Sequence, residues 1–188
     1  MDSVKVGICG LGTVGGGTFA VLARNATEIA ARVGADIVVT QVGSRRDNPK
    51  YDLSGVAVER DVFAVADNPE IDILVELIGG TTVAKELVLR AIANGKHVVT
   101  ANKALIAEHG NEIFAAAAEK GVTVAFEAAV AGGIPIIKAL REGLAGNKIQ
   151  WLAGIINGTG NFILSEMREK GRDFADVLAT PRLTRLLT

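Results

Sequence analysis

The chain has 188 residues, which is enough for one domain of ordinary size or for one domain and part of another. Hydrophobic residues make up 49% of it and aromatic residues only 4%, so its core must consist of Ala, Val, Ile and Leu, a mixture that suits a parallel sheet covered by helices. The formal net charge of −1 gives no basic surplus for nucleic acid, no apolar run reaches the roughly 18 residues of a membrane span, and no signal-peptide pattern is present, so we expect a cytoplasmic protein without a membrane or nucleic-acid partner.

The chain opens with a predicted strand and a glycine-rich turn. Apolar residues within 4–8 predict a buried strand, and Cys9 at its end is expected to be an inert core residue. Because it is the only cysteine, an internal disulfide is excluded. Directly after this strand, Gly10, Gly12 and Gly15 have the G-x-G-x-x-G spacing, at the point where a helical pattern begins.

That spacing, in that place, predicts a dinucleotide-binding turn. The first glycine permits a tight turn, the second lets the backbone approach a pyrophosphate, and the third lets the helix pack closely on the strand. The phosphates would bind free N–H groups at the positive end of the helix dipole. The predicted cofactor-binding residues of this turn are Gly10, Leu11, Gly12, Thr13, Val14 and Gly15.

The end of the second predicted strand bears on the choice of cofactor. We expect one helix over residues 14–33 and a strand over 37–42. An NAD-binding fold usually places an acid after this strand, whereas this chain has Arg45 and Arg46 before its first acid. A guanidinium pairs bidentately with a 2′-phosphate, so the sequence favours NADP over NAD, with Arg45 as the contact and Arg46 as a solvated loop residue.

Strands and helices alternate from there to residue 126. We expect strands at 56–58, 71–78, 97–100 and 122–126, and helices at 61–66, from Thr81 or Thr82 to about 93, and at 107–120. This alternation predicts a Rossmann-type doubly wound parallel sheet of the α/β class. Gly79, at the carboxyl end of the 71–78 strand, would then face the cofactor.

The pattern changes at Glu127. A loop of small residues leads into a helix that begins near Pro135 and reaches about residue 144, followed by a predicted strand at 149–156 and by a turn and helix up to about residue 170. We predict a cofactor domain over residues 1–134 and the beginning of an incomplete α+β substrate and dimerisation domain over 135–188.

Local chemistry leaves several candidate residues with two interpretations each. Lys103 follows a strand at the edge where ligands bind, and either holds a carbonyl or carboxylate there or is a surface lysine. Glu127, with nearby carbonyls, either forms an oxygen-only cation site or caps a helix. Asn157 and Thr159 either bind a small polar substrate or cap a helix.

Five segments together resemble homoserine dehydrogenases in their order and spacing, over about residues 4 to 176: Gly10–Gly15, Val75–Gly80, Gly95–Leu105, Glu127–Pro135 and Asn157–Asn161. The resemblance implies NAD(P)-dependent interconversion of L-homoserine and L-aspartate 4-semialdehyde, on the branch leading to threonine and methionine, by an enzyme that forms homo-oligomers when full-length.

The resemblance also implies roles for individual residues. Lys103 matches the family lysine that contacts the nicotinamide cofactor and the substrate, and Arg45 matches the position that favours the phosphorylated cofactor. Asn157 and Thr159 would bind substrate. The family's sodium site, near the domain junction, would consist of the Glu127 side chain and the carbonyls of Val130, Gly132 and Ile134.

The chain departs from the family pattern after residue 178. The family's Gly-Tyr-x-Glu-x-Asp-Pro and Gly-x-Asp-x-x-x-Lys stretches, which supply the substrate-binding glutamate and a second lysine, do not occur. We therefore expect a truncated or frameshifted product with an intact cofactor domain, and an apolar strand edge at 149–156 that invites dimerisation.

Two other functions remain open at this point. One is a non-catalytic NADP-binding fragment, favoured by the missing second lysine. The other is a sugar or polyol dehydrogenase, because Ala93–Val99 also resembles that group. Those enzymes continue with Glu-Lys-Pro where this chain has Ala-Asn-Lys at 101–103, which counts against the second alternative.

Overall fold

The structure is a computed structural model that describes residues 3–154 and 158–179. The chain divides into two compact units, Met1–Gly143 and Leu144–Thr188, which are described separately below. The predicted boundary after residue 134 remains a prediction. None of the helices over the described residues combines the length and the apolar character needed to cross a bilayer.

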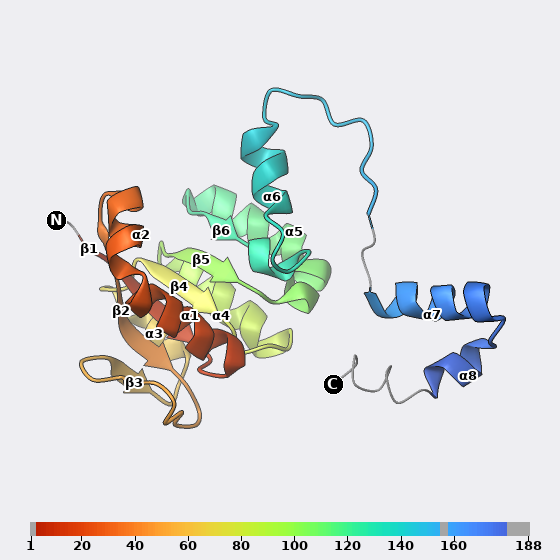
Figure 1. The fold of residues 1–188 in the computed structure, drawn as a ribbon. Coiled ribbons are helices and arrows are strands. Elements are labelled where there is room, and N and C mark those ends of the chain that lie inside the picture. Colours follow the sequence, from red (N-terminus) through yellow and green to blue (C-terminus); the bar gives the residue numbers. More distant parts are fainter. Residues whose placement is uncertain (1–2, 155–157, 180–188) are drawn as a thin grey trace. The chain divides into compact units, whose positions relative to one another are not determined.

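In the first unit, the described residues form a six-stranded sheet whose order is β3-β2-β1-β4-β5-β6 (Figure 1). Every pair of neighbouring strands is parallel, which confirms the predicted doubly wound α/β fold. The direction of winding reverses between β1 and β4, and this is the switch point beside which open α/β sheets bind their ligands. The strands are β1 (Ser3–Cys9), β2 (Asp36–Gly43), β3 (Ala57–Glu59), β4 (Ile73–Glu76), β5 (His97–Thr100) and β6 (Val124–Ala125).

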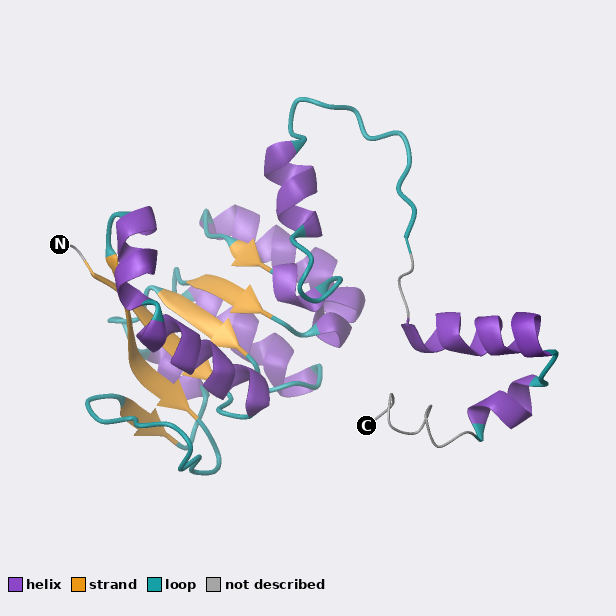
Figure 2. Ribbon diagram, viewed as in Figure 1, coloured by secondary structure: helices purple, strands orange, loops and turns teal. Residues whose placement is uncertain are grey.

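Helices cover both faces of this sheet, as Figure 2 shows. The helices of the Rossmann-type part are α1 (Thr13–Arg24), α2 (Ala26–Val33), α3 (Phe63–Asp67), α4 (Thr82–Ala93) and α5 (Lys103–Lys120). Because side chains alternate along a strand, Cys9 and Leu74 join the core under α3, α4 and α5, whereas Ile8 and Val75 join the core on the α1 face. Each face therefore has its own apolar core.

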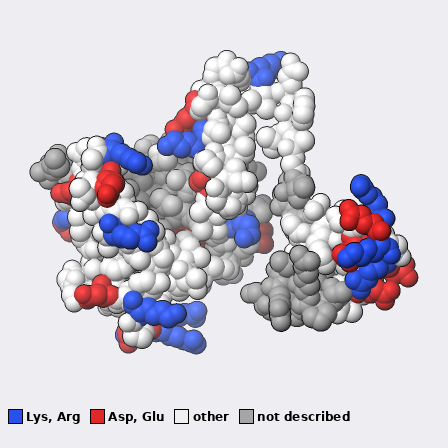
Figure 3. Space-filling view, in the orientation of Figure 1, with Lys and Arg blue, Asp and Glu red and all other residues white. Residues whose placement is uncertain are grey.

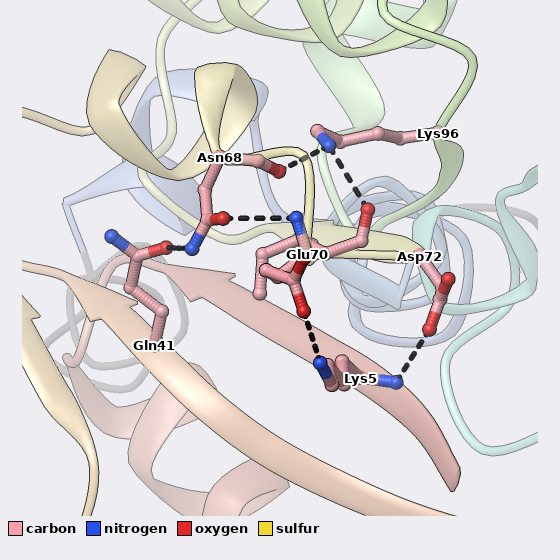
Figure 4. A network of polar contacts seen from close by, with 7 residues as sticks. Lys5, Gln41, Asn68, Glu70, Asp72 and Lys96 are labelled. Atoms are coloured by element: carbon pink, nitrogen blue, oxygen red, sulfur yellow. Dashed lines mark hydrogen bonds and ion pairs between the residues drawn. The ribbon is translucent and has the colours of Figure 1, made fainter. Parts of the chain in front are cut away.

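A polar network ties the strands together away from the glycine turn (Figure 4). Lys96 is only 3% exposed, and its ammonium donates to the carbonyls of Asn68 at 2.5 Å and Ile71 at 2.9 Å. On β1, Lys5 forms an ion pair with Glu70. Burial lowers the pKa of Lys96 below its ordinary value of 10.5, although the charges of two nearby aspartates oppose the shift.

Two predictions about the helices were wrong in detail. The helix expected over 14–33 is two helices, because the backbone of Asn25 leaves the helical region at φ −105° and ψ 21°. Asparagine favours such breaks because its side chain competes for backbone hydrogen bonds. The predicted start of α4 is correct, since Thr81 is its N-cap residue and Thr82 its first helical residue, although neither side chain bonds to a backbone N–H there. The helix expected from 107 begins at Lys103, since the Asn102 side chain accepts from the Leu105 N–H and caps it.

The remaining elements of the first unit follow Glu127. They are η1 (Glu127–Ala129), α6 (Ile136–Lys138) and a π-helical turn, η2 (Ala139–Gly143). Pro135 directly precedes α6, as predicted.

The second unit contains α7 (Gly158–Lys170) and α8 (Phe174–Leu178), which pack through Ile163 and Val177. The strand predicted at 149–156 is wrong over its described part, residues 149–154, which have no regular secondary structure and do not join the sheet. Trp151 is 79% exposed there. An isolated strand leaves its backbone groups without hydrogen-bond partners, so the local apolar pattern alone does not form one.

Candidate functional site

A cavity of about 780 Å³ lies at the carboxyl ends of β1, β2, β3 and β4 in the first unit. Its walls come from four segments: the glycine turn after β1, the 43–48 loop, the 60–63 loop and the 77–79 loop. Since this place adjoins the switch point between β1 and β4, the topology and the cavity independently indicate the same binding site.

The glycine turn has the geometry that its spacing predicts. Gly10 has φ +99°, and a Cβ there would lie 2.6 Å from the Leu77 carbonyl oxygen. A Cβ on Gly15 would lie 1.8 Å from the Gly10 carbonyl oxygen, so α1 approaches the turn too closely for any side chain. A Cβ on Gly12 would meet nothing within 4 Å, which leaves this part of the backbone open on the cavity side.

The first turn of α1 presents unsatisfied donors. Its N-cap is Gly12, which has no side chain to accept from the first N–H groups, and the first turn contains no acidic residue. The turn itself is fixed by hydrogen bonds from the Gly10 N–H to the Gly43 carbonyl and from the Asn48 side chain to the Leu11 carbonyl, each 2.8 Å. A phosphate would therefore meet preorganised N–H donors at the positive end of a 12-residue helix.

Cys9 takes no part in this site. It is completely buried, and burial, together with the charge of Glu76, raises the pKa of its thiol to about 12. The prediction that Cys9 is a core residue is confirmed, and its low reactivity remains a prediction.

Three arginines line the cavity: Arg45, Arg46 and Arg60. Arg45 and Arg46 are both exposed. Arg46 was expected to be only a solvated loop residue, but it lines the cavity as well. The Arg60 guanidinium donates to the Ser44 carbonyl at 3.2 Å and to the Asp47 carboxylate at 2.6 Å. Lys and Arg side chains gather beside β3 on the face shown in Figure 3. The sequence analysis missed Arg60, although a basic residue directly after a short strand was the available signal.

The other predicted cofactor-binding residues fall in two groups. Gly10, Leu11, Gly12, Arg45 and Gly79 line the cavity, whereas Thr13, Val14, Gly15 and Lys103 do not. The last four nevertheless begin the two helices that start at this edge of the sheet, α1 and α5.

Lys103 is the first residue of α5 and is exposed. No described residue forms a hydrogen bond or ion pair with its ammonium. The preceding residue, Asn102, caps α5 and also donates to the Gly80 carbonyl at 2.6 Å. The loop that carries Lys103 is therefore attached to the loop that borders the cavity.

Glu127 is engaged in capping. One of its carboxylate oxygens accepts from the Ile137 N–H and the other from the Lys138 N–H, each at 2.8 Å, so both interpretations of this residue must include the cap of α6. Each oxygen still has a free lone pair. In the loop between, Ala131 has φ +45°, a left-handed backbone that is rare for a residue other than glycine.

Carbonyl oxygens would have to supply most ligands of any cation at Glu127. The described residues hold no group of three or more His, Cys, Asp or Glu side chains suited to a metal. The predicted set of one carboxylate with the carbonyls of Val130, Gly132 and Ile134 consists of hard oxygen donors, which suit a hard cation. The Ile134 carbonyl already accepts from the Ile136 N–H at 2.8 Å and keeps one lone pair.

The two predicted substrate-binding residues both belong to the second unit. Asn157 lies outside the described residues. Thr159 is half-buried in the first turn of α7, a position that fits a helix-terminal role.

Comparisons with known proteins agree with this geometry. Residues 10–127 match the family described as "Homoserine dehydrogenase, NAD binding domain", and residues 135–183 match "Homoserine dehydrogenase". A homoserine dehydrogenase of Pseudomonas aeruginosa is 74% identical over 95% of this chain and 41% of its own length. The chain thus spans about two fifths of the length of that relative.

Solved structures show the same likeness. A homoserine dehydrogenase from Thiobacillus denitrificans superposes with a TM-score of 0.84 and 64% identity, over 95% of this chain and 42% of the other. A hyperthermophilic archaeal homoserine dehydrogenase in complex with NADPH gives a TM-score of 0.69 and 27% identity, over 94% of this chain and 59% of the other.

Proposed function

Because this chain belongs to the homoserine dehydrogenase family, we propose that it binds NADP at the carboxyl edge of its sheet and supplies the cofactor domain for the interconversion of L-homoserine and L-aspartate 4-semialdehyde. The observation that carries the proposal is the uncapped glycine turn, which opens onto a cavity rather than onto other parts of the chain. The first N–H groups of α1 have no side-chain cap, so they can donate to a ligand, and a pyrophosphate fits such donors.

The preference for the phosphorylated cofactor is part of the proposal. No acidic residue stands at the end of β2, where one would bond to ribose hydroxyls, and the exposed guanidinium of Arg45 lines the cavity there. A 2′-phosphate at this place would find a bidentate cationic partner. The NADPH bound by the archaeal relative supports the choice, since its fold is shared.

The chemistry would use Lys103 at the other end of the site. Bound NADPH supplies the hydride that reduces the aldehyde. Lys103 would place its ammonium against the aldehyde oxygen and stabilise the negative charge that develops there. Asn102 holds the residue in this position, because it caps α5 immediately before it.

We also propose that Glu127 and the carbonyls of Val130, Gly132 and Ile134 hold a sodium ion next to the cap of α6. Sodium chloride should then raise the melting temperature more than choline chloride at equal ionic strength. The variant Glu127→Gln should lose this difference. A melting temperature that responds equally to both salts in the unmodified chain contradicts the cation site.

Calorimetric titration of the purified chain tests the main proposal. NADPH should bind more tightly than NADH, and addition of homoserine with NADP tests turnover in the same sample. Binding without turnover supports a cofactor-binding module alone, and turnover of a sugar alcohol would support the other dehydrogenase group. If a folded sample binds neither nucleotide, the proposal is wrong.

For the enzyme as a whole, a small-molecule substrate and assembly into a homo-oligomer are further proposals. They rest on family membership, since this chain spans only about two fifths of the length of the relative from Pseudomonas aeruginosa.

A further inference from the structure

Glu76 is a completely buried carboxylate at the end of β4, and neither the sequence analysis nor the proposed function gives it a role. One of its oxygens accepts from the N–H groups of Ile78 at 3.0 Å and Gly79 at 3.3 Å. The other accepts from the Thr100 hydroxyl at 2.6 Å. A buried charge is costly unless hydrogen bonds satisfy it, and here donors from the 77–80 loop and from the end of β5 do so.

The 77–80 loop forms a wall of the cavity. Ile78 and Gly79 line it, and the Leu77 carbonyl packs against Gly10 of the glycine turn. Gly79 and Gly80 have φ of +74° and +71°, so this stretch has little conformational restriction of its own. The two N–H bonds to Glu76 therefore help to fix the position of this wall, together with the bond from the Leu77 N–H to the Cys9 carbonyl at 2.8 Å.

The other donor, Thr100 at the end of β5, connects Glu76 to the start of α5, where Lys103 lies. The Thr100 hydroxyl, which donates to Glu76, accepts from the Asn102 N–H at 3.0 Å. The Asn102 side chain in turn donates to the Gly80 carbonyl at 2.6 Å. A closed circuit of hydrogen bonds thus runs from β4 to β5, through the start of α5, and back to the 77–80 loop.

The circuit lies at one end of the cofactor site. The arginines that suit the 2′-phosphate follow β2 and β3, on one side of the switch point, whereas Glu76 and Thr100 end β4 and β5 on the other side. A dinucleotide whose pyrophosphate lies on the turn after β1 would extend its nicotinamide half toward β4 and β5.

We propose that Glu76 is a positioning residue for the nicotinamide half of the cofactor. It acts through the 77–80 loop on one side, and through Thr100 and Asn102 on Lys103 on the other, without touching cofactor or substrate itself. This inference rests on the proposed NADP site. A carboxylate that only stabilises the fold would affect binding of the whole cofactor, whereas a positioning role predicts that loss of Glu76 weakens binding of the nicotinamide half alone.

Two probes separate these possibilities: NADPH, and adenosine 2′,5′-bisphosphate, which lacks the nicotinamide half. Glu76→Gln keeps only one acceptor oxygen, so either the Thr100 hydroxyl or the N–H groups of Ile78 and Gly79 lose their acceptor and the circuit is weakened. NADPH should bind about tenfold more weakly, the equilibrium effect expected of one lost charge-assisted hydrogen bond, while the bisphosphate changes by less than about twofold. Glu86→Gln, an exposed carboxylate on α4, is the matched control and should bind both probes normally.

A second pair of variants keeps the test decisive if Glu76→Gln folds poorly. Thr100→Val removes the hydroxyl from the circuit and should reproduce the selective loss of NADPH, whereas Thr100→Ser retains the hydroxyl and should bind both probes like the unmodified chain. Equal losses for both probes would assign Glu76 a merely structural role, and unchanged NADPH binding in both the Gln and Val variants would also overturn the inference. If the unmodified chain binds neither probe, the NADP proposal itself is wrong.

Discussion

Substitution of Gly12 by alanine should weaken NADPH binding strongly while it changes the free energy of unfolding little. The residue has φ −76° and ψ −156°, which alanine adopts without strain, and its Cβ would meet nothing within 4 Å. At a helix N-cap alanine is less favourable than glycine, but it also reduces the entropy of the unfolded chain. These two effects oppose each other, so Gly12→Ala should change the free energy of unfolding by less than about 1 kcal/mol.

Binding should respond very differently. The added methyl group would stand where a pyrophosphate approaches the first turn of α1. Loss of two charge-assisted N–H bonds, at about 1.5 to 3 kcal/mol each, costs about 3 to 6 kcal/mol, or roughly 10²- to 10⁴-fold in the dissociation constant. Calorimetric titration with NADPH measures this change, and chemical denaturation measures stability on the same sample. Gly17→Ala is the control, since its Cβ also meets nothing within 4 Å but the residue does not line the cavity. If Gly12→Ala binds NADPH as well as Gly17→Ala does, the pyrophosphate does not lie on this turn.

Three further predictions concern other parts of the first unit. Arg45→Glu should weaken NADPH binding more than NADH binding, by about 1 to 3 kcal/mol for one charge-assisted contact, and equal losses in parallel titrations would refute the assignment. Lys96→Met should reduce the free energy of unfolding by about 1 to 3 kcal/mol, because two buried carbonyls lose their donor. Burial lowers the pKa of Lys96 in the folded chain below its ordinary value of 10.5, so between the folded-state and unfolded-state pKa values the unfolded chain binds more protons than the folded chain. The stability advantage of the unmodified chain over Lys96→Met should therefore grow as the pH rises through that interval. Denaturation curves in which this advantage shrinks there would contradict the assigned environment. Cys9, with a thiol pKa of about 12, should react with a disulfide reagent at pH 8 only after denaturation, and rapid labelling of the native chain would show that it is accessible.

The sequence could predict those features that depend on neighbouring residues. Apolar runs located most strands, and their alternation with helices was sufficient for the parallel order. The limits of β4 were less predictable: the apolar run covers 71–78, but only Ile73–Glu76 pair as a strand. Ile71 is buried in the core without being part of the strand, and hydrophobicity alone does not distinguish packing from pairing. The expected strand at 149–156 failed for the related reason that no partner strand exists among the described residues.

The candidate site also contains some residues that a local sequence motif predicts and others that only the folded chain brings together. The glycine turn is a local motif, so its spacing predicted its geometry, including the close approach at Gly15. Arg60 and Glu76 depend on tertiary structure, because the loop after β3 and the end of β4 meet the glycine turn only in the folded sheet. A signal for Glu76 was nevertheless present, namely one carboxylate within an otherwise apolar stretch of a central strand. Such a residue must find buried donors, and in a parallel sheet its neighbours at the carboxyl edge are loops that bind ligands.

The charges of the cavity explain why an anionic ligand fits it, although the chain as a whole has a net charge of only −1. Two acidic residues line the cavity, but Asp47 is paired with Arg60, and Asp61 accepts from the N–H of Phe63 at 2.9 Å. The buried Glu76 bonds to its own loops. Among the described residues that line the cavity, the groups left for a ligand are therefore mainly donors: the first N–H groups of α1 and the exposed guanidinium groups of Arg45 and Arg46. A neutral nucleoside would leave these donors unsatisfied, whereas the proposed NADP, with phosphates at both places, would supply acceptors for them.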